Sequence, residues 1–451
     1  MFDVNRRYGI LGLARSGIAA AYKIKEFGGH AFLSELHPRD KIEGTEELCG
    51  DFECEFGGHS ERLFECDEWI VSPGIPLNIP IIKQGCERGI HMISELEFGY
   101  QIKDPGSKII AVTGSNGKST TASLIYHILK GMGYKTLLAG NIGDAFCGFP
   151  IHQPGYDFIV LEVSSFQLDL IDTFKPDVAV LLNITPDHMN RYETFEHYRK
   201  SKFRIFENQT EDDFAVINID SPPIMNNIHA INSPILRFSM DKKAPDTDAW
   251  IDGVFIYLNK KQRLSIHDLS IKGPHNHANT MASLLSVTAL TDNVPLVLDS
   301  VVGFAPLTHR LEYVATIAGV SFYNDSKATN SDSVKSALMS FGRPIRVVMG
   351  GSDKGEDFSV LTEMLKTWAL KVYITGETEA KMRQAWLGKI PLVCINDFEK
   401  CIKTAFEESL AGDIIVLSPA CASFDKFRNF EHRGETFTDI VHKIAMENEK
   451  K

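Results

Sequence analysis

The segment IIAVTGSNGKSTTASLI, residues 109–125, has the order of a phosphate-binding turn. An apolar run precedes a glycine-rich bend, and Lys118 and Ser119 then open a helix-like stretch. Backbone N–H groups of such a bend converge on an oxyanion, the lysine reaches the β- and γ-phosphates, and the hydroxyl binds Mg²⁺. The loop is shorter than the Walker form, because Val112 stands where that form has its first glycine. We predict a phosphate loop, with an incidental glycine turn as the alternative.

A carboxylate follows a second apolar run. Glu162 lies in IVLEVSSFQ, at the predicted carboxyl end of a strand. Parallel strands deliver such side chains to the ligand crevice, and a carboxylate beside a phosphate loop is a usual partner of Mg²⁺. A solvated glutamate at a strand end is the alternative.

A histidine and a lysine come next along the chain. His188, in LLNITPDHMNRY, follows a predicted strand by a few residues, although a surface role is common for a lone loop histidine. The following stretch, ETFEHYRKSKFRIFE, predicts a helix with one apolar face, formed by Phe195, Tyr198, Lys202 and Ile205. An unpaired ammonium on such a face is expensive. Lys202 therefore snorkels to solvent, forms an ion pair or is chemically altered.

The segment IKGPHNHANTMASLLSV opens another predicted helix. Its first turn carries His275, Asn276 and Asn279. The two asparagines offer amide donors and acceptors that suit a base or a ribose. Helix capping is the alternative for either one.

The C-terminal third has polar turns after three predicted strands. They lie in FYNDSKATNSDSV, VMGGSDKGEDF and IIVLSPACASFDKFRNFEHRGETF. Three such strand-end turns favour a site for a small anionic substrate. The residues that they place there are Asp325, Lys327, Thr329, Lys354 and Ser423, with Phe430 and Arg433 downstream.

The N-terminal segment YGILGLARSGIAAA is similar to a dinucleotide-binding turn. It lacks the full G-x-G-x-x-G pattern, because Ala14 holds the middle position. A nucleotide diphosphate held by Ser16 and Gly17 at a helix start fits better than NAD, with Glu35 as a ribose or base partner. VSPGIP adds a strand-end turn at residues 72–74.

The candidate site residues described above can meet only if the chain folds into strands that end beside them. Short apolar runs alternate with helix-period segments along the chain, which predicts an α/β fold with mainly parallel sheets. The expected strands cover residues 8–13, 68–72, 108–114, 157–164, 177–185, 213–220, 346–351, 371–376 and 413–420. Polar breaks at 101–108 and 291–300 suggest three domains, over 1–100, 101–298 and 299–451.

The composition bounds the function. A chain of 451 residues is too long for one core, and a net charge of −12 argues against a broad nucleic-acid surface or an anionic membrane partner. The eight cysteines form no C-x-x-C pair, which favours reduced thiols. Neither a signal peptide nor an apolar run of about 20 residues is evident. We expect a cytoplasmic protein without membrane insertion.

Taken together, the motifs resemble the Mur ligases over residues 8–440. The residues that carry this resemblance form TGSNGKSTT, GNIG, LEVSSFQL, NITPDHMNRY, KSKFRI, HNHANTMAS, THRLE, NDSKATN and LSPACASFDKFRNFEHRGETF. The last motif is typical of members that add D-glutamate. The resemblance implies a Rossmann-like N-terminal domain, a central ATPase domain of the phosphate-loop type and a Rossmann-like C-terminal domain. It also implies joining of D-glutamate to UDP-N-acetylmuramoyl-L-alanine (UDP-MurNAc-L-alanine) at the expense of ATP, for peptidoglycan synthesis, by a monomer.

The resemblance also implies roles for single residues. Lys118, His188, Lys202 and Arg310 are expected in catalysis. Two Mg²⁺ ions are expected at Ser119, Glu162, His188 and Lys202, with Lys202 carried as a carbamate. ATP is expected at Gly114, Ser115, Asn116, Gly117, Lys118, Ser119, Thr120, Asn276, Asn279, Arg310, Asp325 and Lys327. The uridine nucleotide substrate is expected at Ser16, Glu35, Ser72, Gly74, Asn141 and His188, and D-glutamate at Thr329, Lys354, Ser423 and Phe430.

Two other readings remain open. A sister ligase that joins another amino acid, or glutamate to a folate, shares the central motifs. A non-catalytic protein that uses ATP to gate domain motion is the alternative from another class. The strand-end sites outside the phosphate loop favour the enzyme, because a switch does not need them.

Overall fold

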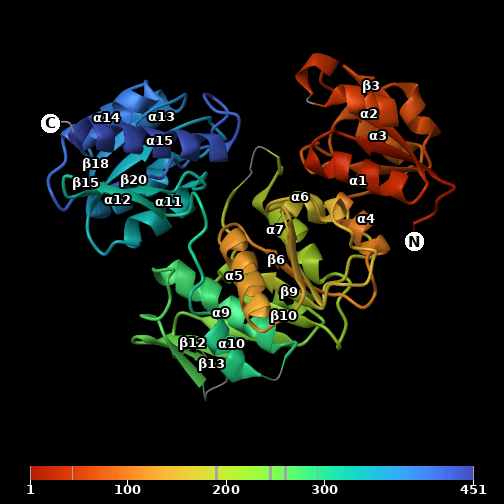
Figure 1. Ribbon diagram of the computed structural model, residues 1–451, viewed down its shortest axis with the longest axis horizontal. Helices are drawn as coiled ribbons and strands as arrows, with labels where there is room; N and C mark the ends of the chain where they lie inside the picture. Colours follow the sequence, from red (N-terminus) through yellow and green to blue (C-terminus); the bar gives the residue numbers. More distant parts are fainter. Residues whose placement is uncertain are drawn as a thin grey trace. The chain divides into compact units, whose positions relative to one another are not determined.

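The computed structural model describes residues 2–42, 44–187, 191–242, 246–258, 262–291 and 293–449. These residues fold into two compact units. Unit 1 comprises Met1–Ile184, Thr194–Ser265 and Ala278–Val302. Unit 2 comprises Thr185–Glu193, Ile266–His277 and Gly303–Lys451. Figure 1 colours the chain along its sequence.

Unit 1 begins with a parallel sheet whose described strands run in the order β3-β2-β1-β4-β5. The strands are β1 (Arg7–Leu11), β2 (His30–Glu35), β3 (Glu53–Phe56), β4 (Glu68–Val71) and β5 (His91–Ile93). The helices around it are α1 (Arg15–Glu26), α2 (Thr45–Asp51), α3 (Pro80–Glu87) and α4 (Glu95–Ile102).

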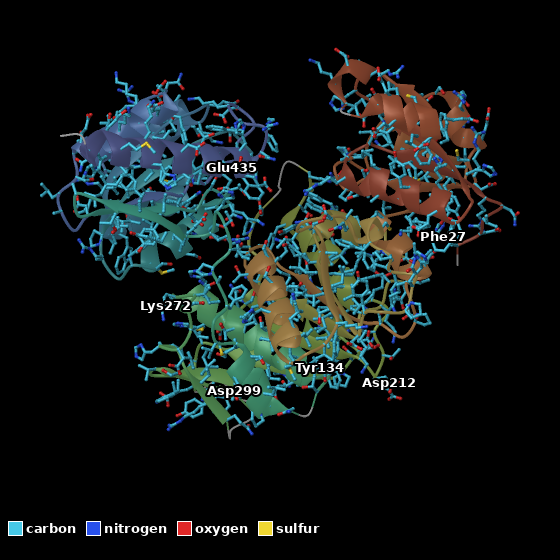
Figure 2. The ribbon with its side chains drawn as sticks, in the orientation of Figure 1. Phe27, Tyr134, Asp212, Lys272, Asp299 and Glu435 are labelled. Atoms are coloured by element: carbon cyan, nitrogen blue, oxygen red, sulfur yellow. The ribbon has the colours of Figure 1, made fainter. Side chains whose placement is uncertain are left out.

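Both faces of this sheet are buried, which is why its strands are apolar at successive positions. Ile10 and Ile70 point into one core cluster, whereas Leu11 and Val71 point into the other. Neighbouring residues of a strand face opposite sides. Helix α1 packs on this sheet, and Phe27 just beyond it, labelled in Figure 2, contacts the His152 ring at a centroid distance of 4.8 Å.

The second sheet of unit 1 has the strand order β14-β13-β12-β11-β10-β9-β6-β8-β7 over the described residues. Pairing is parallel from β7 to β12 and antiparallel from β12 to β14. The strands are β6 (Lys108–Thr113), β7 (Thr136–Gly140), β8 (Phe158–Glu162), β9 (Val178–Leu181), β10 (Phe214–Asn218), β11 (Ile235–Ser239), β12 (Ala249–Asp252), β13 (Phe255–Leu258) and β14 (Gln262–Ser265).

The helices of this part position the candidate residues. Helix α5 (Lys118–Gly131) follows β6 directly and packs against β6, β7 and β8 (Figure 1). The others are α6 (Ser165–Leu168), α7 (Phe195–Phe203), α8 (Pro222–Met225), α9 (Pro274–Thr288) and α10 (Val294–Ser300). Helix α10 packs against α5; Figure 2 labels Asp299 of α10 and Tyr134, which lies three residues beyond α5.

Unit 2 contains a sheet in the order β15-β16-β20-β17-β18-β19, all within the described range 303–449. Only the β15–β16 pair of these described strands is antiparallel. The strands are β15 (Glu312–Ile317), β16 (Val320–Asn324), β17 (Ile345–Met349), β18 (Ala369–Ile374), β19 (Leu392–Cys394) and β20 (Ile414–Leu417). The helices are α11 (Ser331–Met339), α12 (Thr362–Trp368), α13 (Glu379–Trp386), α14 (Phe398–Glu407) and α15 (Phe430–Glu449).

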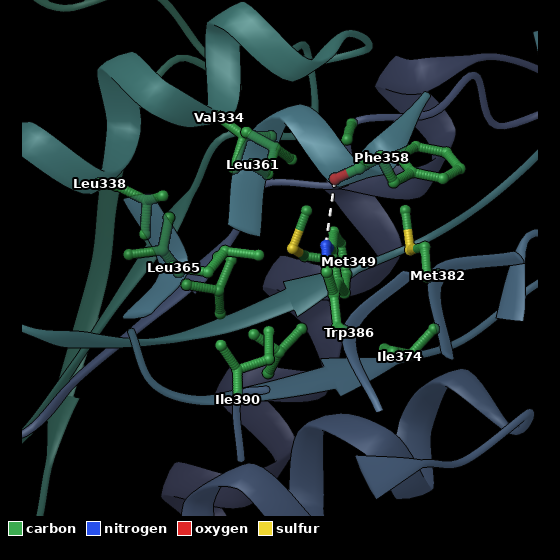
Figure 3. Close-up of a cluster of buried hydrophobic side chains, with 14 of the residues drawn as sticks. Val334, Leu338, Met349, Phe358, Leu361, Leu365, Ile374, Met382, Trp386 and Ile390 are labelled. Atoms are coloured by element: carbon green, nitrogen blue, oxygen red, sulfur yellow. Dashed lines mark hydrogen bonds between the residues drawn. The ribbon is translucent and has the colours of Figure 1, made fainter. Parts of the chain in front are cut away.

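One face of this sheet is covered by α11, α12 and α13. Figure 3 shows the core that forms there, with Met349 and Ile374 from the sheet and Leu338 and Leu365 from the helices. Trp386 is fully buried and donates from Nε1 to the Phe358 carbonyl at 3.0 Å. This bond satisfies the only polar atom of the indole, so a large apolar side chain is buried without an unpaired donor.

The predicted α/β class is confirmed, and each of the nine expected strands corresponds to a strand of the structure. The expected ranges are longer at several ends; β9 stops at Leu181, whereas the expected strand continues to residue 185. Hydrophobicity does not mark the point where the backbone leaves the sheet. The domain limits at 100 and 298 stay predictions. No helix in the described part of the chain has the length and apolar composition needed to cross a membrane.

Candidate active site

The predicted phosphate loop is the turn between β6 and α5. Gly114 and Gly117 have φ of +154° and +89°, conformations that side chains with a Cβ rarely adopt. The loop is fixed to Asn183, which follows β9. The Asn183 carbonyl accepts from Ser115 N at 3.0 Å, and its side chain exchanges two hydrogen bonds with the Asn116 backbone at 2.9 and 3.0 Å. The sequence reading missed Asn183, although it lies in the motif that contains His188.

Asn279, which we predict to contact the nucleotide, adjoins this loop. It is buried on α9, and a Cβ on Gly117 would lie only 2.4 Å from its Oδ1. The close approach explains the glycine at 117 independently of its φ. Thr120, in the first turn of α5, is buried too.

Two lysines meet at the start of the loop. Lys118 donates from Nζ to the carbonyls of Gly114 and Ser115 at 2.9 and 2.8 Å. Lys202 donates from Nζ to the same Gly114 carbonyl at 2.8 Å and lies 4.7 Å from the centre of the Tyr198 ring. The Tyr198 hydroxyl is 3.0 Å from Ser115 Oγ.

Lys202 is 2% exposed, so it does not snorkel to solvent. The predicted apolar face is confirmed, since Tyr198 and Ile205 are buried beside it. The helix itself is shorter than expected: α7 ends at Phe203, and Ile205 lies in the 3₁₀ turn Arg204–Phe206.

Side chains with oxygen atoms that could bind a metal lie at the end of the sheet that carries the phosphate loop. Glu162 ends β8, pairs in register with Val112 and is 2% exposed. Its Oε1 accepts from Asn141 Nδ2 at 2.8 Å. Ser119 is 1% exposed in the first turn of α5. A buried carboxylate and a hydroxyl are the donor types that Mg²⁺ prefers, so these residues fit that ion.

His188, the remaining predicted metal ligand, lies outside the described residues. Among the residues that are described, no group of three or more His, Cys, Asp and Glu side chains is arranged to hold a metal. Unit 1 nevertheless brings together Lys118, Ser119, Glu162 and Lys202, through the loop and the adjacent ends of β6 and β8.

The turn between β1 and α1 is held by two of the residues predicted to meet a uridine nucleotide. Ser72 donates from Oγ to the Gly12 carbonyl at 2.7 Å. Glu35 accepts from Leu13 N at 2.8 Å and from His37 N at 2.9 Å. Burial would raise the pKa of Glu35, but these hydrogen bonds keep it below its ordinary value. Glu35 is therefore an ionised carboxylate that shapes the turn.

Ser16 lies in the first turn of α1, and Gly74 lies in the turn after β4. Gly17 follows Ser16 in contact with the Gly12 carbonyl, which a Cβ at Gly17 would approach to 2.1 Å. These positions do not test whether a nucleotide binds at Ser16 and Gly74, so their role in nucleotide binding stays a prediction.

Unit 2 gathers the C-terminal candidates at the ends of β16, β17 and β20. Asp325 follows β16 and accepts from Ser418 Oγ at 2.9 Å. Burial raises the pKa of Asp325 to about 7, although the Arg310 charge opposes the shift. Lys327 lies over the Phe430 ring, 5.1 Å from its centre. Lys354 donates to the Thr329 carbonyl at 3.3 Å, and Ser423 is 2% exposed.

The start of α9 also belongs to unit 2. Burial, together with the positive charge of Arg310, lowers the pKa of His275 to about 4, so this imidazole is neutral near pH 7. Asn276 donates from Nδ2 at 2.8 Å to the carbonyl of Lys272, which lies two residues before α9. Asn279 belongs to unit 1, whereas Asn276 belongs to unit 2.

A cavity of about 250 Å³ opens beside Lys354, between Asp187, the first turns of α11 and the segment after β17. Glu356 lies in its wall and accepts from the Ser331 backbone N at 2.9 Å and from the Ser331 hydroxyl. The sequence reading missed Glu356 and Asp187, because nothing in their local pattern distinguishes them from solvated loop carboxylates.

Two family models match the chain. Residues 112–287 match the Mur ligase middle domain, and residues 309–421 match the Mur ligase glutamate ligase domain. The first range contains the phosphate loop, Glu162, Lys202 and Asn279. The second contains Arg310, Asp325 and Lys354.

Named relatives are similar over the whole chain. The UDP-N-acetylmuramoylalanine–D-glutamate ligase of Koribacter versatilis is 39% identical over 452 residues, which are 99% of this chain and 99% of the relative. The corresponding ligase of Geobacillus kaustophilus is 37% identical over 449 residues, 98% of this chain and 99% of the relative.

Solved structures share the fold at lower identity. The ADP complex of the MurF ligase of Thermotoga maritima has a TM-score of 0.65 and 19% identity, covering 99% of this chain and 100% of that one. The UDP-N-acetylmuramate–alanine ligase of the same organism has a TM-score of 0.63 and 16% identity, covering 97% and 100%. The phosphate loop with its two lysines, the family matches and the full-length similarity agree, and the chain therefore belongs to the Mur ligases, among the UDP-N-acetylmuramoylalanine–D-glutamate ligases.

Proposed function

We propose that the chain joins D-glutamate to UDP-MurNAc-L-alanine and converts ATP to ADP and phosphate. The observation that carries this proposal is the similarity to D-glutamate ligases over nearly all of the chain, including both the phosphate loop and the C-terminal turns. Each chain supplies every candidate residue named above, so we expect a monomer to suffice.

The reaction needs an activated carboxyl group, because a carboxylate is a poor electrophile. The terminal carboxylate of UDP-MurNAc-L-alanine attacks the γ-phosphorus of ATP in line, the bond to ADP breaks, and an acyl phosphate forms. The amine of D-glutamate then attacks the acyl carbon and loses a proton. The tetrahedral intermediate expels phosphate and leaves the amide.

The chain's own groups act by charge and by position. Lys118 and Arg310 neutralise the charge that develops on the transferred phosphoryl oxygens. The backbone N–H groups of the loop orient the phosphates at the start of α5. Asn279, packed on Gly117, is a further proposed nucleotide contact, as are Asp325 and Lys327 by the family resemblance.

Two Mg²⁺ ions would be held by Ser119, Glu162, His188 and Lys202, with Lys202 as a carbamate. When bound, the ions would supply positive charge to the phosphate oxygens. The neutral Lys202 amine would add to CO₂ and lose a proton, so a buried cation becomes an anion, and the Lys118 ammonium and the bound ions would balance its charge. Support comes from the burial of Lys202 and from its bond to the phosphate loop.

Ser16, Glu35, Ser72, Gly74 and Asn141 are proposed to meet the uridine nucleotide. Thr329, Lys354, Ser423 and Phe430 are proposed to surround D-glutamate. The support for the amino-acid site is the joining of Lys354 to Thr329 and the burial of Ser423 at the carboxyl end of β20.

The test is a coupled assay with mass analysis of the product. The protein is incubated with ATP, Mg²⁺ and UDP-MurNAc-L-alanine, and D-glutamate is compared with L-glutamate, D-aspartate, L-alanine and L-lysine. We expect phosphate release that depends on both co-substrates, and a product with D-glutamate alone. Another preferred amino acid would identify a sister ligase, and phosphate release without co-substrates would identify an ATPase switch.

A further inference from the structure

Arg433, near the start of α15, is buried in unit 2 without a carboxylate at ion-pair distance among the described residues. It is 2% exposed, whereas Glu435, labelled in Figure 2 and two residues further along the helix, is exposed. The guanidinium makes hydrogen bonds to neutral oxygens: Nε to Ser326 Oγ at 3.0 Å, Nη2 to Ser326 O at 2.8 Å and to Cys421 O at 3.1 Å, and Nη1 to Ala422 O at 3.1 Å.

These bonds join two turns that leave the sheet at neighbouring strands. Ser326 lies in the turn from β16 to α11, and Cys421 and Ala422 lie in the segment from β20 to α15. The same two turns are joined by the bond from Ala420 N to Ala328 O at 2.9 Å. The planar guanidinium fixes both turns at once, because its donors point in set directions.

A third turn, after β17, reaches the same point. Ser352 N donates to the Ala422 carbonyl at 2.9 Å, and a Cβ on Gly351 would lie 3.0 Å from Arg433 Nη1. Gly351 therefore leaves room for the guanidinium. Lys354 follows three residues later, so all three turns that carry proposed D-glutamate residues converge on Arg433.

The arrangement is costly if its purpose is stability alone. A buried charge without a counter-charge is expensive, and an apolar side chain of similar size often serves stability as well or better. A buried cation does, however, provide a fixed positive potential for a bound anion, which needs no reorganisation when that anion arrives. Asp425 is the acidic residue whose charge acts on it most directly.

We propose that Arg433 is a positioning residue that sets the specificity of the amino-acid site for a dicarboxylic substrate, by fixing Ser326–Thr329 and Cys421–Ser423 and by its charge. This inference rests on the proposed function. D-glutamate carries one carboxylate more than a neutral amino acid, so a fixed positive charge behind the site favours it. Most of the proposed ATP residues lie on the phosphate loop, and only Lys327 lies within Ser326–Thr329, so ATP and UDP-MurNAc-L-alanine gain less from this charge.

The experiment compares full-length Arg433→Met and Arg433→Lys with Arg343→Met, which removes an exposed arginine from the same unit. KM is measured separately for D-glutamate, ATP and UDP-MurNAc-L-alanine, and folding is followed by circular dichroism and thermal unfolding. We expect Arg433→Met to raise KM for D-glutamate about tenfold or more, a change worth about 1.4 kcal/mol, with less than about a twofold change for the other substrates. The D-glutamate KM of Arg433→Lys should lie between those of wild type and Arg433→Met, because lysine keeps the positive charge but lacks the planar set of guanidinium donors.

The outcomes separate the two proposals. A wild-type protein that makes no product from D-glutamate overturns the proposed function. Active wild type with an unchanged KM for D-glutamate in both variants, or with equal increases for all three substrates, overturns the role of Arg433. If Arg433→Met does not fold, the role of Arg433 is tested by the same comparison of KM values in two other variants. These are Arg433→Lys and Arg433→Ala, the latter with added methylguanidinium. Recovery of the D-glutamate KM by methylguanidinium supports the proposal, and its absence in folded protein contradicts it.

Discussion

Lys118 and Lys202 donate hydrogen bonds to one acceptor, the carbonyl oxygen of Gly114, at 2.9 and 2.8 Å. Two ammonium groups that share an acceptor repel each other, and the repulsion is stronger in a buried site than in water. Conversion of Lys202 into a carbamate would replace one of the two cations by an anion. The shared acceptor therefore supports the proposed modification of Lys202 on grounds that do not involve a metal.

Loss of the Lys118 charge should abolish ADP release. Lys118→Ala leaves the glycines and the start of α5 in place, but it removes the cation that we propose to neutralise the phosphoryl oxygens. We expect a fall in kcat of about 100-fold or more, the size measured when one preorganised electrostatic donor is removed elsewhere. Lys130→Ala, on the exposed side of the same helix, is the matched control and should keep normal turnover. Near-normal activity of Lys118→Ala would show that the loop does not act in catalysis.

Lys202→Ala should be inactive and should regain part of its activity with a short carboxylic acid. The carboxylate would take the place of the carbamate in the space that the side chain leaves. The assay titrates acetate and propionate at constant ionic strength, with Lys200→Ala, an exposed neighbour on α7, as control. Activity of Lys202→Ala without any added acid would show that Lys202 has only a structural role.

Lys354→Ala and Ser423→Ala should selectively weaken the binding of D-glutamate. Both residues lie at the strand ends of unit 2, where a cation and a hydroxyl suit a carboxylate. We expect KM for D-glutamate to rise about tenfold or more, with smaller changes for ATP. Lys366→Ala removes an exposed lysine on α12 and serves as control. An unchanged D-glutamate KM in both variants would place the amino-acid site elsewhere.

Glu95 should make stability depend on pH. Burial raises the pKa of Glu95 from 4.5 to about 7, even though its Oε1 accepts from Cys147 N at 2.6 Å. Between these values the folded protein keeps the proton and the unfolded chain has lost it, so the free energy of unfolding falls as pH rises. One pKa unit is worth about 1.4 kcal/mol, which makes the full contribution about 3 kcal/mol.

Glu95→Gln removes this titration. The Tm of the variant relative to wild type should therefore increase between about pH 5 and about pH 8, as measured by scanning calorimetry. Glu87→Gln changes an exposed glutamate on α3 and should show no such trend. A constant Tm difference for Glu95→Gln across this range would contradict the raised pKa.

The sequence by itself determined the α/β class, the phosphate loop and the apolar face that buries Lys202. These features follow from local patterns, since glycines at a turn, periodic apolar positions and strand-end polar residues act over a few neighbouring positions. The motifs also indicated the family, because many of its characteristic segments occur along this one chain. The positions of Asp325, Lys327, Thr329, Lys354 and Ser423 after strands were predicted for the same reason.

Only the tertiary structure decided which distant groups meet. Asn183 bonds to the loop 67 residues before it, Glu35 holds the backbone at Leu13, and Arg433 reaches Ser326 across 107 residues of sequence. No local pattern specifies such pairs, because they depend on strand order and on how the turns pack. The strands β12–β14 escaped prediction as well. Each is only four residues long and partly exposed, and β12 and β14 mix polar with apolar residues, unlike the buried parallel strands.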